Sequence, residues 1–394
     1  MLRTVAGTST RAPWHRAFAR PASSTLRALS TSSQPDTHRV KLVEVGPRDG
    51  LQNEKAVIDT SVKVELIERL VKAGLRDVEA GSFVSPKWVP QMASTADVLL
   101  SSQLSALRST HGSSLSLPVL VPNARGLSSL LDLPGQDSAD SPLTREIAVF
   151  VSASEGFSRA NLNCSVAESL SRLEPVFATA RDKGLKVRGY VSVVLGCPFD
   201  GRVDPRKVGE VARALKNMGA YEVSLGDTIG VGVPKGWDGV VEACEQKGVP
   251  AAQLAAHCHD TYGTALASIL HCVSRLGIRT VDSSIAALGG CPYSPGATGN
   301  VSTEDVVYAL AASGISSNVL PDPVAAAGEP WEVLGGESGH GERARRFEEL
   351  CAVGDWISAQ LGRENGSRVG KAMKGRRERR EREEAKKRGA KAKL

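Results

Sequence analysis

The sequence predicts an α/β fold, a (β/α)8 TIM barrel, on two observations. Between residues 40 and 315, short apolar runs rich in β-branched residues alternate with amphipathic helical patterns. Eight such pairs occur, the number that closes a parallel sheet into this kind of barrel. A doubly wound open sheet is the alternative. It would normally carry G-x-G-x-x-G after its first strand, whereas this chain has GPRDGLQNE at 46–54.

The individual elements follow from local patterns. The strands are predicted at 39–45, 76–80, 117–121, 146–151, 186–194, 221–225, 253–257 and 279–285. The clearest helices are predicted at 61–74, 165–183, 204–218, 234–247, 262–276 and 303–313. Asp204 and Thr303 are the residue types that cap helix N-termini, and Pro205 and Pro234 suit a first helical turn.

Composition divides the rest of the chain. We predict a barrel domain, a small C-terminal helical extension and a basic tail, at 35–315, 316–370 and 371–394. Three segments are expected to be inserted or loose. They are the Ser-rich 101–116, the loop 133–144, and a Pro-, Gly- and Glu-rich insert at 321–342 within the extension.

Both ends of the chain are expected to be disordered and to carry targeting signals. Residues 1–34 hold five arginines, many Ser, Thr and Ala, and no acid, which is typical of a mitochondrial transit peptide. The last three residues, Ala392-Lys393-Leu394, resemble the S-K-L peroxisomal signal. The expected location is the mitochondrial matrix, with the peroxisome as a further possibility, and import receptors are the implied partners.

The net charge of +6 gives little support for nucleic-acid binding. Residues 1–34 carry +5 and residues 371–394 carry +8, so the remaining body carries −7. No apolar run is long enough for a membrane helix, and we expect no membrane span. Seven cysteines without a C-x-x-C motif indicate reduced thiols.

Polar residues follow the predicted strands, where a barrel of this kind places its active site. Among them are Arg48, Asp49, Glu79, Asn123, Ser152, Asp227, His257, His259 and Asn300. Their position at strand ends predicts that they meet at one mouth of the barrel.

A metal site is predicted among these residues. His257 and His259 are two apart, so on a continuing strand both imidazoles face the same side, and Cys258 faces the core. Asp49 lies on a nearby strand, and Asn300 adds a side-chain carbonyl. This mixture of nitrogen and oxygen ligands suits Mg²⁺ or Mn²⁺ better than a closed thiolate zinc site.

Five segments together resemble one family. They are VGPRDGLQNE (45–54), GSFVSPKWVPQM (81–92), LGDTIGVGVP (225–234), AAHCHDTYGTAL (255–266) and GGCPYSPGATGNVSTEDVVY (289–308). This set resembles the 3-hydroxy-3-methylglutaryl-CoA lyase family, within the metal-dependent barrel lyases and synthases. The resemblance spans about residues 40–315. GLQNE and the Cys-containing loop distinguish it from isopropylmalate and homocitrate synthases.

The resemblance implies a metal-dependent retro-Claisen cleavage of 3-hydroxy-3-methylglutaryl-CoA to acetyl-CoA and acetoacetate. It matches the metal ligands to Asp49, His257, His259 and Asn300. It gives catalytic positions to Arg48, which steadies the enolate, to its supporting Glu79, to the loop thiol Cys291, and to Asp227. The base is Asp227 or His257. It also implies a homodimer acting in leucine degradation and ketone-body formation.

The acyl-CoA substrate is expected to meet further side chains at the rim. Arg48, Ser82, Trp88, Asn123 and Ser152 are the predicted substrate-binding residues. Two other functions compete: a synthase that condenses acetyl-CoA with a 2-oxo acid, and a nucleic-acid binder that uses the basic tail. The synthase generally needs more chain than the roughly 80 residues after 315, and the binder leaves the rim residues unexplained. We therefore expect no nucleic-acid partner.

Overall fold

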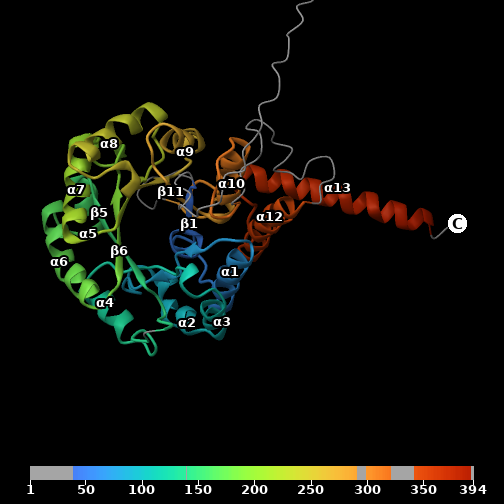
Figure 1. The fold of residues 1–394 in the computed structure, drawn as a ribbon, viewed down its shortest axis with the longest axis horizontal. Coiled ribbons are helices and arrows are strands. Elements are labelled where there is room, and N and C mark those ends of the chain that lie inside the picture. Colours follow the sequence, from blue (N-terminus) through green and yellow to red (C-terminus); the bar gives the residue numbers. More distant parts are fainter. Residues whose placement is uncertain (1–38, 139, 291–298, 321–340, 392–394) are drawn as a thin grey trace, which may run out of the picture. The chain divides into compact units, whose positions relative to one another are not determined.

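Short parallel strands occupy all eight positions at which the sequence predicts them (Figure 1). The computed structural model describes residues 39–138, 140–290, 299–320 and 341–391. The strands are β1 (Lys41–Glu44), β2 (Asp77–Val78), β3 (Gly81–Ser82), β4 (Val119–Leu120), β5 (Glu146–Ser152), β6 (Lys186–Ser192), β9 (Glu222–Asp227), β10 (Leu254–Cys258) and β11 (Thr280–Ser283). The second predicted strand, 76–80, contains β2, and β3 follows directly after it, with two residues between β2 and β3.

The ring of strands closes through this split position. The hydrogen-bonded order is β2-β1-β11-β10-β9-β6-β5-β4-β3, so β2 and β3 stand at its two ends. Between them, the Glu79 N–H donates to the carbonyl of Glu44 in β1 at 2.9 Å. The Ala80 N–H donates to the Pro118 carbonyl, just before β4, at 2.8 Å. The predicted (β/α)8 barrel is therefore confirmed, and residues 77–82 form its seam.

Helices surround the strands on the outside of the ring (Figure 1). They are α1 (Thr60–Lys72), α2 (Thr95–Leu100), α3 (Ser102–His111), α4 (Ala124–Leu131), α5 (Glu155–Leu162), α6 (Val166–Asp182), α7 (Pro205–Met218), α8 (Pro234–Gln246), α9 (Ala265–Ser274) and α10 (Thr303–Ala312). A small hairpin of β7 (Gly196–Cys197) and β8 (Gly201–Arg202) follows β6. All six predicted helices are confirmed.

Two local predictions about helix starts have different outcomes. Asp204 caps α7, because its carboxylate accepts from the Arg206 N–H at 3.0 Å. Thr303 is not a cap. Ser302 caps α10 by accepting from the Asp305 N–H at 3.0 Å, and Thr303 is the first helical residue.

The Ser-rich segment 101–116 is not loose, which corrects its predicted structure. It forms α3, whose N-terminus is capped by the Ser101 hydroxyl. Leu104 and Leu107 lie three residues apart on the buried face of α3, and this stripe holds the helix against the barrel. The predicted loop 133–144 contains neither helix nor strand in its described residues.

The barrel separates an apolar layer from a charged interior. Alternate residues of β6 show the division, because Val187 and Val191 join the apolar core between sheet and helices. Arg188 lies on the opposite side of the same strand, fully buried among charged partners inside the ring. The interior can therefore hold ionised side chains in place of the usual branched aliphatic layers.

Two helices follow the barrel, α12 (Glu342–Gln360) and α13 (Arg368–Lys391). α12 packs on α1 and α10, where Phe347 stacks on Tyr308 with ring centroids 6.2 Å apart. The first turn of α13 is fixed by Asp305, whose carboxylate accepts from the Ser367 hydroxyl and the Val369 N–H.

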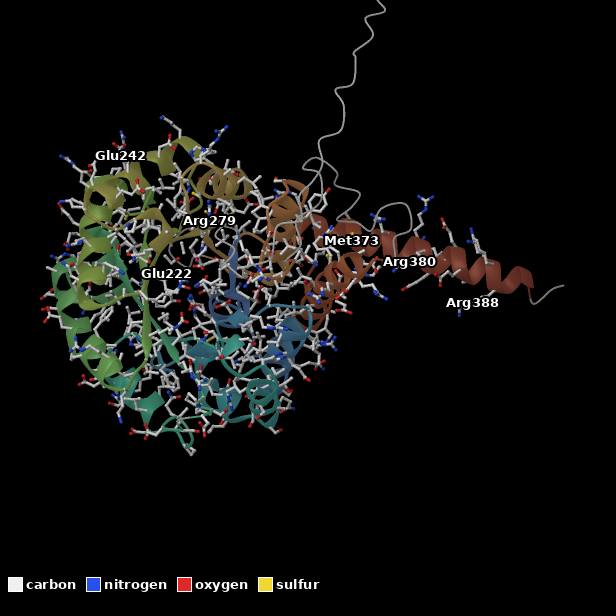
Figure 2. The ribbon with its side chains drawn as sticks, in the orientation of Figure 1. Glu222, Glu242, Arg279, Met373, Arg380 and Arg388 are labelled. Atoms are coloured by element: carbon white, nitrogen blue, oxygen red, sulfur yellow. The ribbon has the colours of Figure 1, made fainter. Side chains whose placement is uncertain are left out.

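Beyond its first turns, α13 is a polar helix. Met373 is its last buried side chain among those described, and the exposed Arg380 and Arg388 lie further along it (Figure 2). Ion pairs four residues apart, such as Arg379 with Glu383, support this part. No helix in the described ranges combines the length and apolarity needed to cross a bilayer. The six described cysteines are buried and unpaired.

Candidate active site

A tight turn directly after β1 presents the first two site residues. Residues Gly46–Gly50 form a single π-helical turn that carries Arg48 and Asp49. The turn starts with the Gly46 N–H donating to a Glu44 carboxylate oxygen at 2.8 Å. A side chain at position 46 would lie 2.5 Å from that oxygen, so the approach requires glycine.

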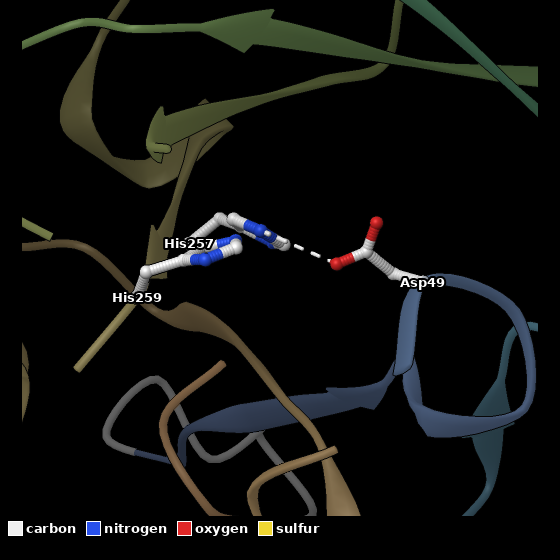
Figure 3. Close-up of side chains that lie close together, drawn as sticks. All are labelled: Asp49, His257 and His259. Atoms are coloured by element: carbon white, nitrogen blue, oxygen red, sulfur yellow. Dashed lines mark ion pairs between the residues drawn. The ribbon is translucent and has the colours of Figure 1, made fainter. Parts of the chain in front are cut away.

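His257 and His259 come from the end of β10 and face the same side. The ladder continues past Cys258, because the His259 N–H donates to the Asp227 carbonyl at 3.3 Å. The two imidazole centroids are 5.5 Å apart, and Asp49 approaches them from across the barrel mouth (Figure 3). Cys258, between them, is buried in the apolar core.

This group has the geometry of a divalent cation site. One ligand atom from each of Asp49, His257 and His259 lies within 4.8 Å of the others. The His257 Nε2 and the Asp49 Oδ2 are 4.0 Å apart, too far for a hydrogen bond. Two donors that share an ion at about 2.1 Å each lie about 3 to 4.2 Å apart. The donor set present therefore fits a metal ion.

Asn300 stands beside this group but presents its amide nitrogen. Its Nδ2 donates to Asp49 Oδ2 at 2.8 Å and to the Leu288 carbonyl at 3.2 Å. A backbone bridge to His259 fixes Asn300 at the same mouth. Ligation through the Asn300 carbonyl oxygen therefore requires its amide to turn over.

Arg48 is held rigidly on both sides. Its Nε donates to Glu79 at 2.7 Å and its guanidinium also donates to Asp49 at 2.8 Å. The Tyr190 hydroxyl donates to the other Glu79 oxygen at 2.7 Å, so Glu79 is fixed in turn. Burial alone would raise the pKa of Asp49, but Arg48 and the histidines outweigh it and lower that pKa. Asp49 is therefore anionic at neutral pH, the form in which a carboxylate can bind a cation.

Asp227 lies at the end of β9, next to β10, and is 2% exposed. Its carboxylate accepts from the Gly232 N–H at 2.8 Å and the Val231 N–H at 3.2 Å. Burial raises the pKa of Asp227 to about 6, although these backbone donors act to lower it. The side chain thus orders the loop after β9, and it lies near enough to His257 for the imidazole to act on its pKa.

The predicted substrate-binding residues lie on the same rim with differing local roles. Asn123 caps α4 by accepting from the Gly126 N–H at 3.0 Å. The Ser82 hydroxyl accepts from the Val84 N–H, and the Ser152 hydroxyl bonds the backbone of Ser154. Trp88 is 85% exposed in the loop after β3. Cys291 lies outside the described residues.

A charged network beneath the mouth was not foreseen from the sequence. Arg188 donates to Asp282 at 2.7 and 3.1 Å, to Glu222 at 2.7 Å and to the Tyr190 hydroxyl at 2.6 Å. Asp282 in turn lies 3.2 Å from His257 Nδ1. The available signal was a charged residue at an inward-facing position inside an otherwise apolar strand, in KVRGYVS and in TVDS.

Known proteins are similar to this chain in both sequence and fold. The family model described as HMGL-like matches residues 39–324. The hydroxymethylglutaryl-CoA lyase of Bos taurus is 51% identical over 296 residues, 75% of this chain and 86% of its own length. That of Pseudomonas mevalonii is 46% identical and covers 85% of this chain and 96% of its own length.

Solved structures agree. The hydroxymethylglutaryl-CoA lyase of Pseudomonas aeruginosa matches with a TM-score of 0.72 at 45% identity, over 86% of this chain and 98% of that chain. An HMG-CoA lyase of Acinetobacter baumannii, solved with coenzyme A and 3-methylmalate, has a TM-score of 0.69 at 27% identity, over 86% of this chain and 97% of that chain. The match to the family model covers more than half of the sequence, and the metal-ligand geometry lies within it. The chain belongs to the HMGL-like family of metal-dependent enzymes.

Proposed function

We propose that this chain is a hydroxymethylglutaryl-CoA lyase, which cleaves 3-hydroxy-3-methylglutaryl-CoA to acetyl-CoA and acetoacetate. The observation that carries the proposal is the meeting of Asp49, His257 and His259 with the Arg48–Glu79 pair at one barrel mouth. These residues lie in the region aligned with relatives named hydroxymethylglutaryl-CoA lyase.

Asp49, His257 and His259 would hold the divalent metal, Mg²⁺ or Mn²⁺, with Asn300 as a further ligand. When bound, the ion supplies Lewis acidity that lowers the pKa of the substrate hydroxyl. Nitrogen ligands with carboxylate and amide oxygens favour these ions over a thiolate-held metal.

Arg48 offers fixed N–H donors to the thioester oxygen, on which negative charge develops as the carbon–carbon bond breaks. Glu79 and Tyr190 orient Arg48 before substrate arrives, so little reorganisation is needed. The hydrogen bond from Arg48 to Glu79 also keeps the guanidinium from turning toward solvent.

The substrate hydroxyl proton goes to Asp227 or His257. We favour Asp227, because Nδ1 of His257 contacts Asp282 and its Nε2 faces the metal ligands. A metal-bound His257 has no lone pair left for the proton. Cys291 is proposed to protonate the enolate carbon, as the resemblance implies.

The same proposal includes two targeting signals and an oligomeric state. Residues 1–34 act as a mitochondrial presequence read by import receptors, in line with relatives that are named mitochondrial. The Ala392-Lys393-Leu394 end adds a peroxisomal signal. The enzyme acts as a homodimer. Each subunit contains the barrel, the helices after residue 315, and the basic tail.

The test is a product assay on the purified full chain. 3-Hydroxy-3-methylglutaryl-CoA is supplied with Mg²⁺, with Mn²⁺ and with EDTA, and acetyl-CoA and acetoacetate are measured. Release of equal amounts of both products, abolished by EDTA, is expected. A folded enzyme that releases neither product with either metal, yet condenses acetyl-CoA with a 2-oxo acid, would identify the synthase instead.

A further inference from the structure

The Asp282 carboxylate is not among the proposed metal ligands or substrate-binding residues, but it contacts the proposed metal ligand His257 on the ring nitrogen that faces away from Asp49. Asp282 is on β11, where it pairs in register with His257 on β10, and is 1% exposed. Its Oδ2 is 3.2 Å from Nδ1 of His257. The other ring nitrogen, Nε2, points to Asp49 Oδ2 at 4.0 Å. His257 thus stands between two carboxylates, one on each nitrogen.

Asp282 accepts three hydrogen bonds from two other residues, so its position is not set by the histidine alone. Arg188 on β6 donates to both of its oxygens, at 2.7 Å and 3.1 Å. The Ser224 hydroxyl on β9 donates to Oδ2 at 2.7 Å. Arg188 is fixed in turn by Glu222 at 2.7 Å. A bidentate arginine pair of this kind adds geometric precision as well as energy.

This arrangement restricts the protonation of the imidazole. An ionised carboxylate only accepts hydrogen bonds, so Nδ1 of His257 must carry the proton that it shares with Asp282. Nε2 then holds the free lone pair, and it is the atom that faces Asp49 and His259.

We propose that Asp282 is a positioning residue that fixes the Nδ1–H tautomer and the ring orientation of His257, so that Nε2 is presented to the metal. Carboxylates behind ligating histidines act this way in many metal sites, where their loss weakens metal binding about 10- to 100-fold. The inference rests on the proposed metal-dependent function.

The variant Asp282→Asn tests the tautomer. Arg188 donates to both oxygens of Asp282 and Ser224 donates to Oδ2, so the new amide can keep only one of these two acceptor positions. With its NH₂ toward His257, the amide favours the opposite tautomer, with Nε2 protonated and unable to bind metal. With its oxygen toward His257, it is an uncharged and therefore weaker acceptor for the Nδ1 proton. The size of the side chain is unchanged.

Glu222→Gln is the matched control. It removes the other buried carboxylate partner of Arg188, at the same 2.7 Å, but Glu222 makes no contact with His257. Any effect that comes only from disturbing Arg188 appears in both variants. An effect through His257 appears in Asp282→Asn alone.

The first measurement is Mn²⁺ affinity of the full chain, by electron paramagnetic resonance of free Mn²⁺ during titration. We expect binding weakened about 10- to 100-fold in Asp282→Asn and changed less than about twofold in Glu222→Gln. Equal affinity in wild type and Asp282→Asn, or equal loss in both variants, overturns the positioning role. Failure of the wild type to bind Mn²⁺ would instead remove the proposed metal centre.

The second measurement does not depend on any variant of Asp282. ¹⁵N-histidine NMR of the metal-free wild type, with the His257 signals assigned by their loss in His257→Asn, reports which ring nitrogen is protonated. Protonation at Nδ1 supports the inference. Protonation at Nε2 overturns it, whatever the metal affinity proves to be.

Discussion

The barrel interior and the junction between the barrel and its C-terminal helices both bury carboxylates, but the partners and the pKa values of these carboxylates differ. In the interior, Glu222 and Asp282 pair with Arg188, and Glu79 pairs with Arg48. Arg188 and the bond to His257 hold the pKa of Asp282 well below its usual range, against the effect of burial. The pKa of Glu222 is lowered as well, so both carboxylate partners of Arg188 are ionised at neutral pH.

At the junction, two carboxylates have no arginine or lysine among their hydrogen-bond partners in the described structure. Glu44 accepts from the Ile285 N–H and the Thr303 hydroxyl, and Glu304 accepts from the Ala286 N–H. Burial raises the pKa of Glu44 to about 7 and that of Glu304 to about 8. The two carboxylates without a cation thus hold a proton to a higher pH than the carboxylates that pair with Arg188, and this difference can be tested.

The largest effect is expected from removing the interior cation. Arg188→Met leaves Glu222 and Asp282 buried without their partner and should lower the free energy of unfolding by about 3 to 5 kcal/mol. Urea denaturation at neutral pH measures it. Lys72→Met, which breaks the exposed pair with Glu68, should change it by less than about 1 kcal/mol. Similar losses in the two variants would contradict the comparison.

The second interior arginine should affect turnover more than stability. Arg48→Gln removes a charged donor aimed at the developing oxyanion, so kcat should fall on the order of 10²-fold or more. Steady-state kinetics and a urea curve on the same preparation separate the two effects. Arg48→Lys keeps the charge without the fork and should be nearly as impaired. Turnover near wild type in Arg48→Gln would remove Arg48 from the mechanism.

The junction should respond to pH. The pKa of Glu304 is raised from 4.5 to about 8 on folding, so its contribution to stability is complete below about pH 4.5 and is lost as pH rises through about 8. Glu304→Gln does not titrate. Relative to wild type, its free energy of unfolding should rise by roughly 2 to 4 kcal/mol between pH 5 and pH 9. Urea curves at intervals over this range measure the trend.

In the same experiment, Glu222→Gln should show the opposite dependence of stability on pH. Arg188 and Lys41 lower the pKa of Glu222 against the effect of burial, so its contribution to stability is present above the unfolded pKa and is lost as pH falls. The deficit of Glu222→Gln should therefore shrink in acid. Parallel pH trends in the two variants would show that the regions do not differ.

The smallest effect is expected outside both regions. Every described side chain in residues 381–394, from 381 to 388, is exposed, so deleting this segment should change the free energy of unfolding by less than about 1 kcal/mol. The same urea curve measures it. Met373→Ala, which empties a buried position in α13, should cost more, about 2 kcal/mol or above. A larger loss from the truncation would assign the tail a structural role.

Sequence patterns predicted the barrel because each strand carries its own local signal. The two histidines could be placed together because a two-residue spacing on one strand fixes their side. α3 was missed because its serines dominate the composition, while only Leu104 and Leu107 reveal its buried face. Sequence alone does not separate Thr303 from Ser302 as the cap of α10, because the two neighbouring hydroxyl side chains have equal capping chemistry.

The interior network could not be predicted in the same way. Arg188 and Asp282 lie 94 residues apart, and their pairing depends on which strands face each other across the ring. Nor does any local pattern tell a buried acid with a cation from one without. The raised pKa values of Glu44 and Glu304 emerge only from the packed structure.

The seam of the barrel has a consequence for how activity returns after denaturation. Glu79 closes the ring through its backbone bond to Glu44, and its side chain orients Arg48. Arg48, the proposed catalytic arginine, therefore gains its support from Glu79 only when residues 77–82 have joined the ring. In a refolding experiment, recovered turnover would serve as a clock for ring closure, lagging behind signals that report helices alone.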